Sequence, residues 1–377
     1  MKLNKAIFGV TIVFSVLLLV SFKSFDIVAE YSETIDSLRK LYTQPSSSWP
    51  KPTVDKSVVF DELAPLPQPS IKASEERILL GKTLFFDSRL SSSNQISCAT
   101  CHKPELSWTD GLQVSIGHDK ALNTRNSPTI ENVWFYNKLF WDGRANNLEE
   151  QAAIPLTSEI EMHQDMKLLP GKLKKVKGYA QLFKKAFGDR EITSERILAS
   201  IADFQRTIVS GRSKFDQFLE GDSESLNNEE LLGLHLFRTK ARCMNCHHGA
   251  LLTDNEFHNL GLSNFGKKNQ DLGLYNATKN PNDAGKFKTP SLRNVMNTGP
   301  WFHDGSVKTM DSLMLLYNMG MPFPAVTMAQ LDDPLLPKND RLLKGIRLSR
   351  SEMNAIIAFL GAISVKPAAF EVPKLPR

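Results

Sequence analysis

The sequence predicts a mainly α-helical protein made of two domains that share one plan. All four cysteines fall in two copies of one short pattern, Cys-x-x-Cys-His, at residues 98–102 and 243–247. The segments around each copy also resemble each other. Apolar residues recur at helical spacing, whereas the alternating pattern of strands is scarce.

Length and charge fit a globular protein. The 377 residues are 41% hydrophobic and 23% charged, which allows two or three domains with ample core. The net charge is +5, and Lys2, Lys5 and Lys23 in the N-terminal leader account for three of these charges. So small an excess argues against a nucleic-acid partner held by bulk charge.

The N-terminus predicts export. Residues 6–22 form an apolar run behind two lysines, so residues 1–23 are expected to be either a cleaved signal peptide or a retained membrane anchor. The protein is then periplasmic. Residues 24–71, rich in proline and serine over 44–70, are expected to form an extended arm or linker.

The cysteine pattern predicts cofactor attachment. Cys-x-x-Cys-His is typical of c-type haem, where two thiols bond to the vinyl groups and the histidine becomes the proximal iron ligand. Two disulfides, a zinc site or a thioredoxin-like motif are alternatives. A thioredoxin-like motif would need a βαβ setting that the sequence does not show, and a zinc site does not explain a histidine at the same place in both copies. We therefore expect two covalently bound haems c. They are held by Cys98, Cys101 and His102 and by Cys243, Cys246 and His247.

The repeated segments indicate an internal duplication. Residues 80–85 match 232–237, and 128–133 match 290–295. We expect an N-terminal haem domain at 72–215 and a C-terminal one at 216–377.

The two copies differ at informative positions. Thirteen residues after each matched proline, Trp141 stands where His303 stands in the second copy. Fourteen residues later, Pro155 corresponds to Tyr317. Proline offers no ligand, whereas a tyrosine phenolate can bind ferric iron. The two haems are therefore expected to have different roles.

Helices are expected in four places. Residues 74–85 and 228–238 should precede the haem motifs, and 193–211 carry an apolar face behind a capping residue, Thr193. Ser349-x-x-Glu352 is a capping box before a fourth helix. Long loops, 103–128 and 249–300, are expected to wrap the haems.

Several segments together resemble the bacterial diheme cytochrome c peroxidase family. They are ISCATCH, SIGH, RNSPT, FWDGRANNLEEQAAIP, CMNCHHG, FKTPSLRNV and HDGS, within roughly residues 72–362. The resemblance implies an enzyme that reduces hydrogen peroxide to water in the periplasm, often as a homodimer. Electrons from a small cytochrome c or a cupredoxin would enter at the C-terminal haem. They would then pass to the N-terminal, peroxidatic haem.

The resemblance also implies roles for matched positions. His118 corresponds to the histidine that closes the N-terminal haem iron in the resting oxidised enzyme, and Trp141 to the tryptophan between the haems. Gln151 and Glu161 correspond to the polar pair of the peroxide pocket, where a carboxylate serves as proton shuttle. The matched calcium ligands between the domains are Asn126, Thr298 and Pro300.

One position departs from the well-known peroxidases, which have a methionine where this chain has Tyr317. A tyrosine there resembles the diheme enzyme that matures methylamine dehydrogenase. A phenolate stabilises ferric iron and lowers its potential, whereas methionine raises it. The alternatives to Tyr317 are Met319 or Met321 as the ligand, or an open site. The alternative function is thus an oxidase of a protein or small molecule, and a plain electron carrier is disfavoured by the pocket acid Glu161.

Overall fold

The computed structural model describes residues 32–324 and 326–377, and it is mainly helical, as the sequence predicts. Two strands of two residues each, β1 (Phe257–His258) and β2 (Phe287–Lys288), pair antiparallel. The α-helices are α2 (Ser32–Tyr42), α3 (Glu75–Phe86), α4 (Cys98–Cys101), α5 (Leu148–Thr157), α6 (Leu169–Lys174), α7 (Lys177–Phe187), α8 (Ser194–Gln205), α9 (Lys214–Leu219), α10 (Asn228–Arg238), α11 (Tyr275–Thr278), α12 (Met310–Asn318) and α13 (Arg350–Ala362).

The expected leader, residues 1–23, lies outside the described residues. Among the residues that are described, no helix is both long and apolar enough to cross a membrane.

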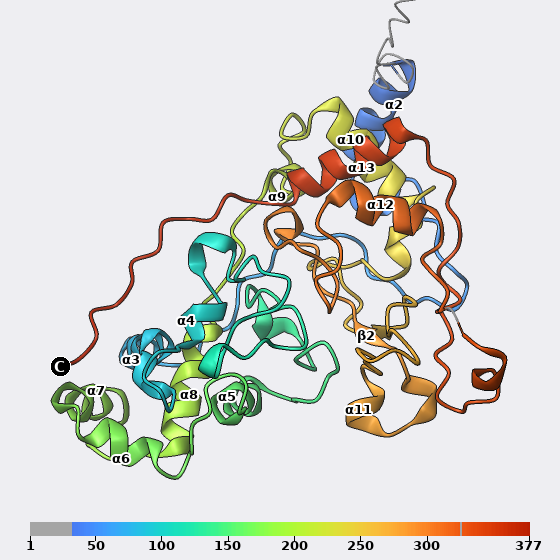
Figure 1. The fold of residues 1–377 in the computed structure, drawn as a ribbon. Helices are drawn as coiled ribbons and strands as arrows, with labels where there is room; N and C mark the ends of the chain where they lie inside the picture. The colour runs from blue at the N-terminus through green and yellow to red at the C-terminus, as the bar shows by residue number, and fades with distance from the viewer. Residues whose placement is uncertain (1–31, 325) are drawn as a thin grey trace, which may run out of the picture.

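Two hydrophobic cores organise the chain. The first is built around α3, α5, α7 and α8, and the second around α2, α10, α12 and α13. Figure 1 shows the first group in cyan and green beside the second group. The connecting loops between the two groups carry most of the residues discussed below.

Each core contains a helix pair in close contact at a glycine. A Cβ on Gly81 in α3 would overlap the carbonyl oxygen of Ser200 in α8. A Cβ on Gly233 in α10 would likewise overlap the carbonyl oxygen of Ala355 in α13. Only glycine allows backbones to approach this closely, so the two matched glycines explain why each pair packs tightly.

The chain leaves α8 earlier than expected. Thr193 caps the helix by accepting a hydrogen bond from the Arg196 amide, as predicted. The helix ends at Gln205, however, and not at Gly211. The reason is tertiary, because the backbone beyond the helix bonds to Asn132. The Asn132 amide donates to the Ile208 carbonyl at 2.9 Å, and the Ser210 amide donates to the Asn132 side chain.

The same arrangement occurs after α13, which begins at the predicted capping box of Ser349 and Glu352. There the Asn294 amide donates to the Ile363 carbonyl at 3.3 Å. The Val365 amide donates to the Asn294 side chain at 2.7 Å.

The N-terminal arm packs on the second core. The expected extended segment 24–71 includes the helix α2, and its Trp49 and Leu63 are buried in that core. Arg238 of α10 is fully buried, forms an ion pair with Glu62 and donates to the Pro50 carbonyl. The arm is therefore part of the packed structure.

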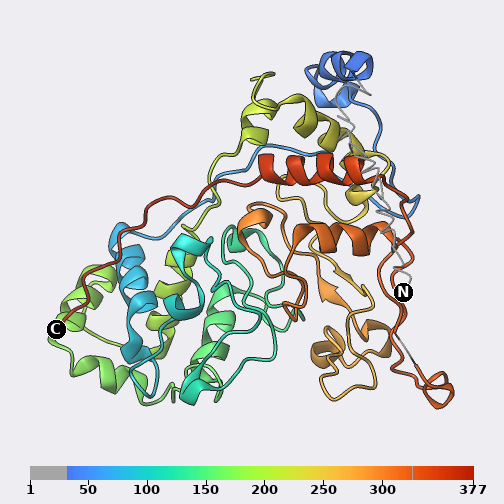
Figure 2. The ribbon, with the colours of Figure 1, turned by 45° about the horizontal axis from the view of Figure 1, so that its top comes forward.

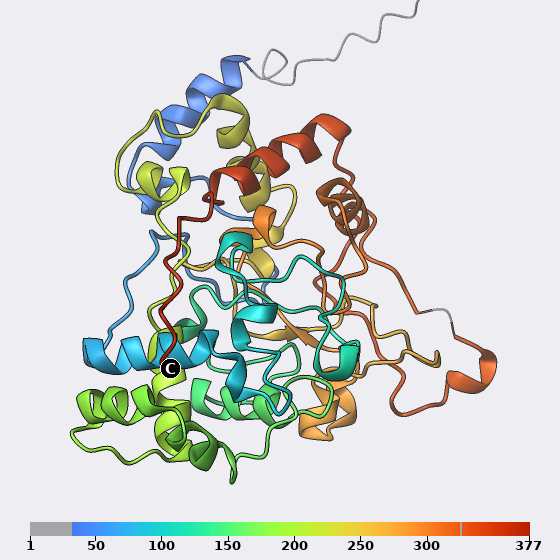
Figure 3. The same cartoon turned by 60° about the vertical axis from the view of Figure 1, so that its left-hand side comes forward.

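The C-terminal tail crosses in the other direction. Beyond α13 it runs to the first group of helices and ends near α7 (Figures 1 and 2). Phe370 stacks on Phe86 and contacts Trp108 edge to face, with ring centroids 5.4 Å and 5.0 Å apart. Arg89 donates to the Pro376 carbonyl at 2.9 Å. Figure 3 shows the chain end lying beside α3.

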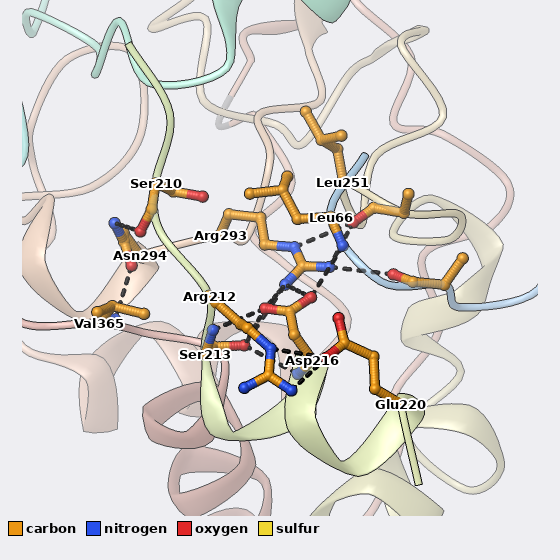
Figure 4. A network of polar contacts seen from close by, with 12 residues as sticks. Leu66, Ser210, Arg212, Ser213, Asp216, Glu220, Leu251, Arg293, Asn294 and Val365 are labelled. Carbon is orange, nitrogen blue, oxygen red and sulfur yellow. Dashed lines mark hydrogen bonds and ion pairs between the residues drawn. The ribbon is translucent and has the colours of Figure 1, made fainter. Parts of the chain in front are cut away.

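A buried ion pair ties the arm, α9 and the loop 249–300 together. Arg293 and Asp216 are both buried, and an Arg293 nitrogen lies 2.7 Å from each carboxylate oxygen (Figure 4). The guanidinium also donates to the carbonyls of Ala64 and Ala250. Because every partner is satisfied, loss of either charge would leave the other unpaired in the interior.

Candidate active site

A cavity of about 730 Å³ is lined mainly by residues of the first half of the chain, and Asp271 and Lys288 are among those that the second half adds. Cys98, Cys101 and His102 line it, and so do Gln151 and Glu161. The predicted attachment residues and the predicted polar pair therefore share one cavity. Its volume falls within the roughly 300–1,000 Å³ typical of cofactor and ligand sites.

His102 is arranged as a metal ligand. Its Nδ1 lies 3.0 Å from the Trp108 carbonyl, which can only accept, so Nδ1 carries the proton and Nε2 keeps its lone pair. Burial lowers the pKa of His102, which favours the neutral imidazole that binds metals. The residues therefore fit a c-type haem.

The polar pair comes from different elements. Gln151 lies on α5, which is capped by the Asn147 side chain. Glu161 follows that helix and accepts a 2.9 Å hydrogen bond from the Asn123 amide group. Asn123 also lines the cavity, and no sequence signal pointed to it. The carboxylate of Glu161 can exchange a proton with a small polar molecule in the cavity. The side-chain amide of Gln151 can donate a hydrogen bond to the same molecule.

His118 does not line this cavity in the described structure. Its neighbour Gly117 does, while the His118 ring contacts His163 with ring centroids 4.8 Å apart. Its Nδ1 is buried without a hydrogen-bond partner, and its Nε2 lies 3.4 Å from Asp119. The backbone thus holds this loop at the cavity edge with the imidazole turned to other residues.

A second cavity contains the other cysteine motif. This cavity is smaller, with a volume of about 210 Å³, and Cys243, Cys246 and His247 are among the residues that line it. His247 repeats the arrangement of His102, with Nδ1 2.9 Å from the Leu252 carbonyl, and burial also lowers its pKa. These residues fit a second c-type haem by the same reasoning.

Tyr317 lines this second cavity from α12. Burial, and next the nearby Cys246, raise its pKa, so the phenol is neutral unless a cation such as ferric iron binds it. Met319 is 67% exposed, and Met321 is buried. Neither of these alternatives lines the cavity, as the structure describes it.

Two other methionines line the second cavity. Met310 and Met314 lie on α12, the helix of Tyr317, and face the same space. Nothing in the sequence singles them out, because apolar residues at helical spacing are typical of ordinary core.

Two basic residues that line the second cavity, Arg242 and His258, differ in their hydrogen-bond partners. The Nε and one Nη of Arg242 are buried without a hydrogen-bond partner. His258 is held between Asp254 and Asp340 at 2.8 Å and 2.6 Å. Burial opposes its charge, but these carboxylates raise the pKa of His258 to about 12. His258 is therefore a cation that offers no lone pair to a metal.

Trp141 lines both cavities. Its indole Nε1 donates to the Asn126 carbonyl at 3.0 Å, and Asn126 also lines both. His303, the counterpart of Trp141, lines the second cavity and stacks on Phe287 with ring centroids 3.5 Å apart.

The predicted calcium positions line the same cavity as Trp141. Asn126, Thr298 and Pro300 all line the second cavity. Calcium takes 6–8 oxygen ligands, so three residues alone would not complete its coordination.

The chain is similar to several known proteins. A family described as di-haem cytochrome c peroxidase matches residues 75–224. The methylamine utilization protein MauG of Methylorubrum extorquens is 38% identical over 304 residues, 80% of this chain and 82% of that protein. The cytochrome-c peroxidase IdrP1 of Pseudomonas sp. strain SCT is 35% identical over 348 residues, covering 83% and 89%.

A solved structure is also similar. It is a MauG-like protein associated with microbial copper homeostasis, 31% identical, with a TM-score of 0.72. The match covers 83% of this chain and 96% of that protein.

Proposed function

Because the chain belongs to the di-haem cytochrome c peroxidase family, a family of oxidoreductases acting on peroxide, we propose that it reduces hydrogen peroxide to water in the periplasm. A small cytochrome c or cupredoxin supplies the electrons. One observation carries the proposal: a single cavity brings Cys98, Cys101 and His102 together with Gln151 and Glu161.

The two cysteine motifs each hold a covalently attached haem in this proposal, and the two halves arise from one duplicated domain. Matched contacts support the duplication: Gly81 and Gly233 sit at the same place in their helix pairs. Asn132 and Asn294 likewise bond to the chain beyond α8 and α13. Calcium would bind at Asn126, Thr298 and Pro300.

When bound, the haems supply an iron site for peroxide and accept and deliver electrons one at a time. The reaction takes up two electrons and two protons for each peroxide and yields two water molecules. Glu161 takes a proton from one peroxide oxygen and returns it to the leaving oxygen. Gln151 donates a hydrogen bond that orients the substrate. Trp141 forms the wall common to both cavities and carries electrons between them.

His118 bears on activation. Its ring packs against His163 and does not line the cavity of His102. This placement supports a first haem that is open to peroxide without prior reduction.

Peroxide-dependent oxidation of a reduced small c-type cytochrome tests the proposal. The holoprotein, with two haems per chain, should oxidise the cytochrome at a rate that saturates with peroxide. Turnover should not need preincubation with reductant. A fully loaded protein that leaves the reduced cytochrome untouched contradicts the peroxidase function.

A second candidate is an oxidase of a protein or small organic substrate. It is favoured by Tyr317, which lines the second cavity where Met319 and Met321 do not, and by the similarity to MauG.

Electron paramagnetic resonance of the wild type and of Tyr317→Met discriminates the two candidates. A tyrosinate-bound second haem should give a signal that the variant replaces with one typical of His/Met ligation. Tyr317→Phe serves as the control, because it removes only the phenol oxygen. Identical spectra for all three proteins exclude tyrosine ligation and remove the main support for the oxidase.

A further inference from the structure

Lys288 occupies an unusual place between the two cavities. Among the described residues that line both cavities, Lys288 is the one with a charged side chain. It lies on β2, and its backbone amide donates to the Trp141 carbonyl at 2.9 Å. The residue is half-buried.

The ammonium group has an aromatic neighbour but no acidic one. Its Nζ lies 3.1 Å from the centre of the Tyr136 ring, and Tyr136 belongs to the first half of the chain. Among the described residues, no carboxylate lies within ion-pair distance of Lys288. Burial alone lowers the pKa of Lys288 to about 7, so in the empty cavities its charge is poorly stabilised.

Two arginines that line the first cavity, Arg125 and Arg144, already have carboxylate partners. Arg125 forms ion pairs with Asp142 and Asp271 at 2.6 Å and 2.7 Å. Arg144 pairs with the same Asp142 at 2.8 Å. The carboxylates of these pairs are therefore engaged, and Lys288 lines both cavities without an acidic partner among the described residues.

We propose that Lys288 binds a haem propionate at the junction of the two cavities, beside Trp141. The ligand is thus a carboxylate of the cofactor, and this inference rests on the proposed function only in that haem fills the cavities. A buried ammonium and a carboxylate stabilise each other because each compensates the other's loss of hydration. The pairing would fix the propionate edge against Trp141.

The pairing also sets the reduction potential. An uncompensated carboxylate near the iron stabilises the more positive, ferric state. The ammonium offsets this charge, so removing it should shift the midpoint potential of the nearer haem to a more negative value. This effect does not depend on peroxide.

Redox titration followed by optical absorption tests the inference in three variants with two haems per chain. Lys288→Met should lower a midpoint potential, whereas Lys288→Arg, which keeps the charge, should stay near the wild type. Lys286→Met is the matched control, because Lys286 lies two residues away and pairs with Asp283 at 3.0 Å. Unchanged potentials in Lys288→Met overturn the proposal.

A measurement on the wild-type holoprotein needs no variant. Competitive labelling with acetic anhydride over a pH series, read by mass spectrometry, gives the pKa of the Lys288 amine. Paired with a propionate, the amine should titrate near an ordinary lysine, at about 10.4. A value near 7 shows an unpaired amine and overturns the proposal. Neither readout uses peroxide turnover, so a failure here and a failure of the peroxidase function are separate results.

Discussion

The indole Nε1 of Trp141 donates a 3.0 Å hydrogen bond to the backbone carbonyl of Asn126, and both residues line both cavities. The ring is therefore held in one orientation in the wall that the two cavities share. A relay between redox centres requires such a fixed position.

Trp141→Phe should slow turnover while keeping the fold. Phenylalanine retains an aromatic ring but loses the larger indole and its hydrogen bond, which costs about 1 kcal/mol of stability. We expect steady-state peroxide turnover to fall about tenfold or more, equivalent to at least about 1.4 kcal/mol in the barrier. Stopped-flow reduction of each haem measures the step directly. Unaltered electron transfer between the haems would show that Trp141 is merely core.

Glu161→Gln should remove proton transfer. The amide keeps the size of the side chain that bonds to Asn123, but it cannot cycle a proton. General acid–base catalysis contributes about 10²–10⁴-fold, so turnover at saturating peroxide should fall by that order. Glu159→Gln is the matched control, because Glu159 is exposed and lies outside the cavity lining. Equal rates in the two variants would reject the role of Glu161.

Phe370→Ala should weaken the first half of the molecule although Phe370 lies near the C-terminus. The half-buried ring packs on Phe86 and Trp108, so we expect a loss of about 2 kcal/mol, below the figure for a fully buried phenylalanine. The Trp108 carbonyl accepts from His102, and the absorption of the first haem should therefore change too. Val372→Ala is the control, because Val372 is 61% exposed. A thermal melt followed at the haem band measures both effects.

Glu131 should make stability depend on pH. It lies between the halves and accepts a 2.7 Å hydrogen bond from Asn294, and burial raises the pKa of Glu131 to about 7. The folded state thus retains a proton that the unfolded chain releases above its ordinary carboxyl pKa. Its stabilising contribution is full below about pH 4.5 and is lost as pH rises to about 7, by up to roughly 3 kcal/mol.

Denaturant unfolding at a series of pH values measures this loss. The midpoint of Glu131→Gln should vary less between about pH 4.5 and 7 than that of the wild type. Parallel pH profiles for the two proteins would mean that Glu131 titrates normally.

Local chemistry explains what could be predicted. Thr193 and the Ser349–Glu352 box cap helices because their side chains satisfy amides only three residues away. Such short-range bonds depend on neighbouring residues alone. The cysteine motifs and the family segments are also short stretches of sequence. From them alone, His102, Gln151 and Glu161 could be predicted to share one site.

Long-range contacts explain the rest. The end of α8 at Gln205 depends on Asn132, more than 70 residues earlier, and the packing of Phe370 depends on Trp108. The contact between the rings of His118 and His163 likewise depends on residues that are far apart in the chain.

The sequence by itself determined the helical class, the two Cys-x-x-Cys-His motifs, the capped helix starts and the family, since each is encoded in residues close together in the chain. Only the tertiary structure decided that Trp141 and Lys288 line both cavities and that Tyr317, not Met319 or Met321, faces the second. The physical reason is that burial and charge pairing depend on segments that meet only after the chain has folded.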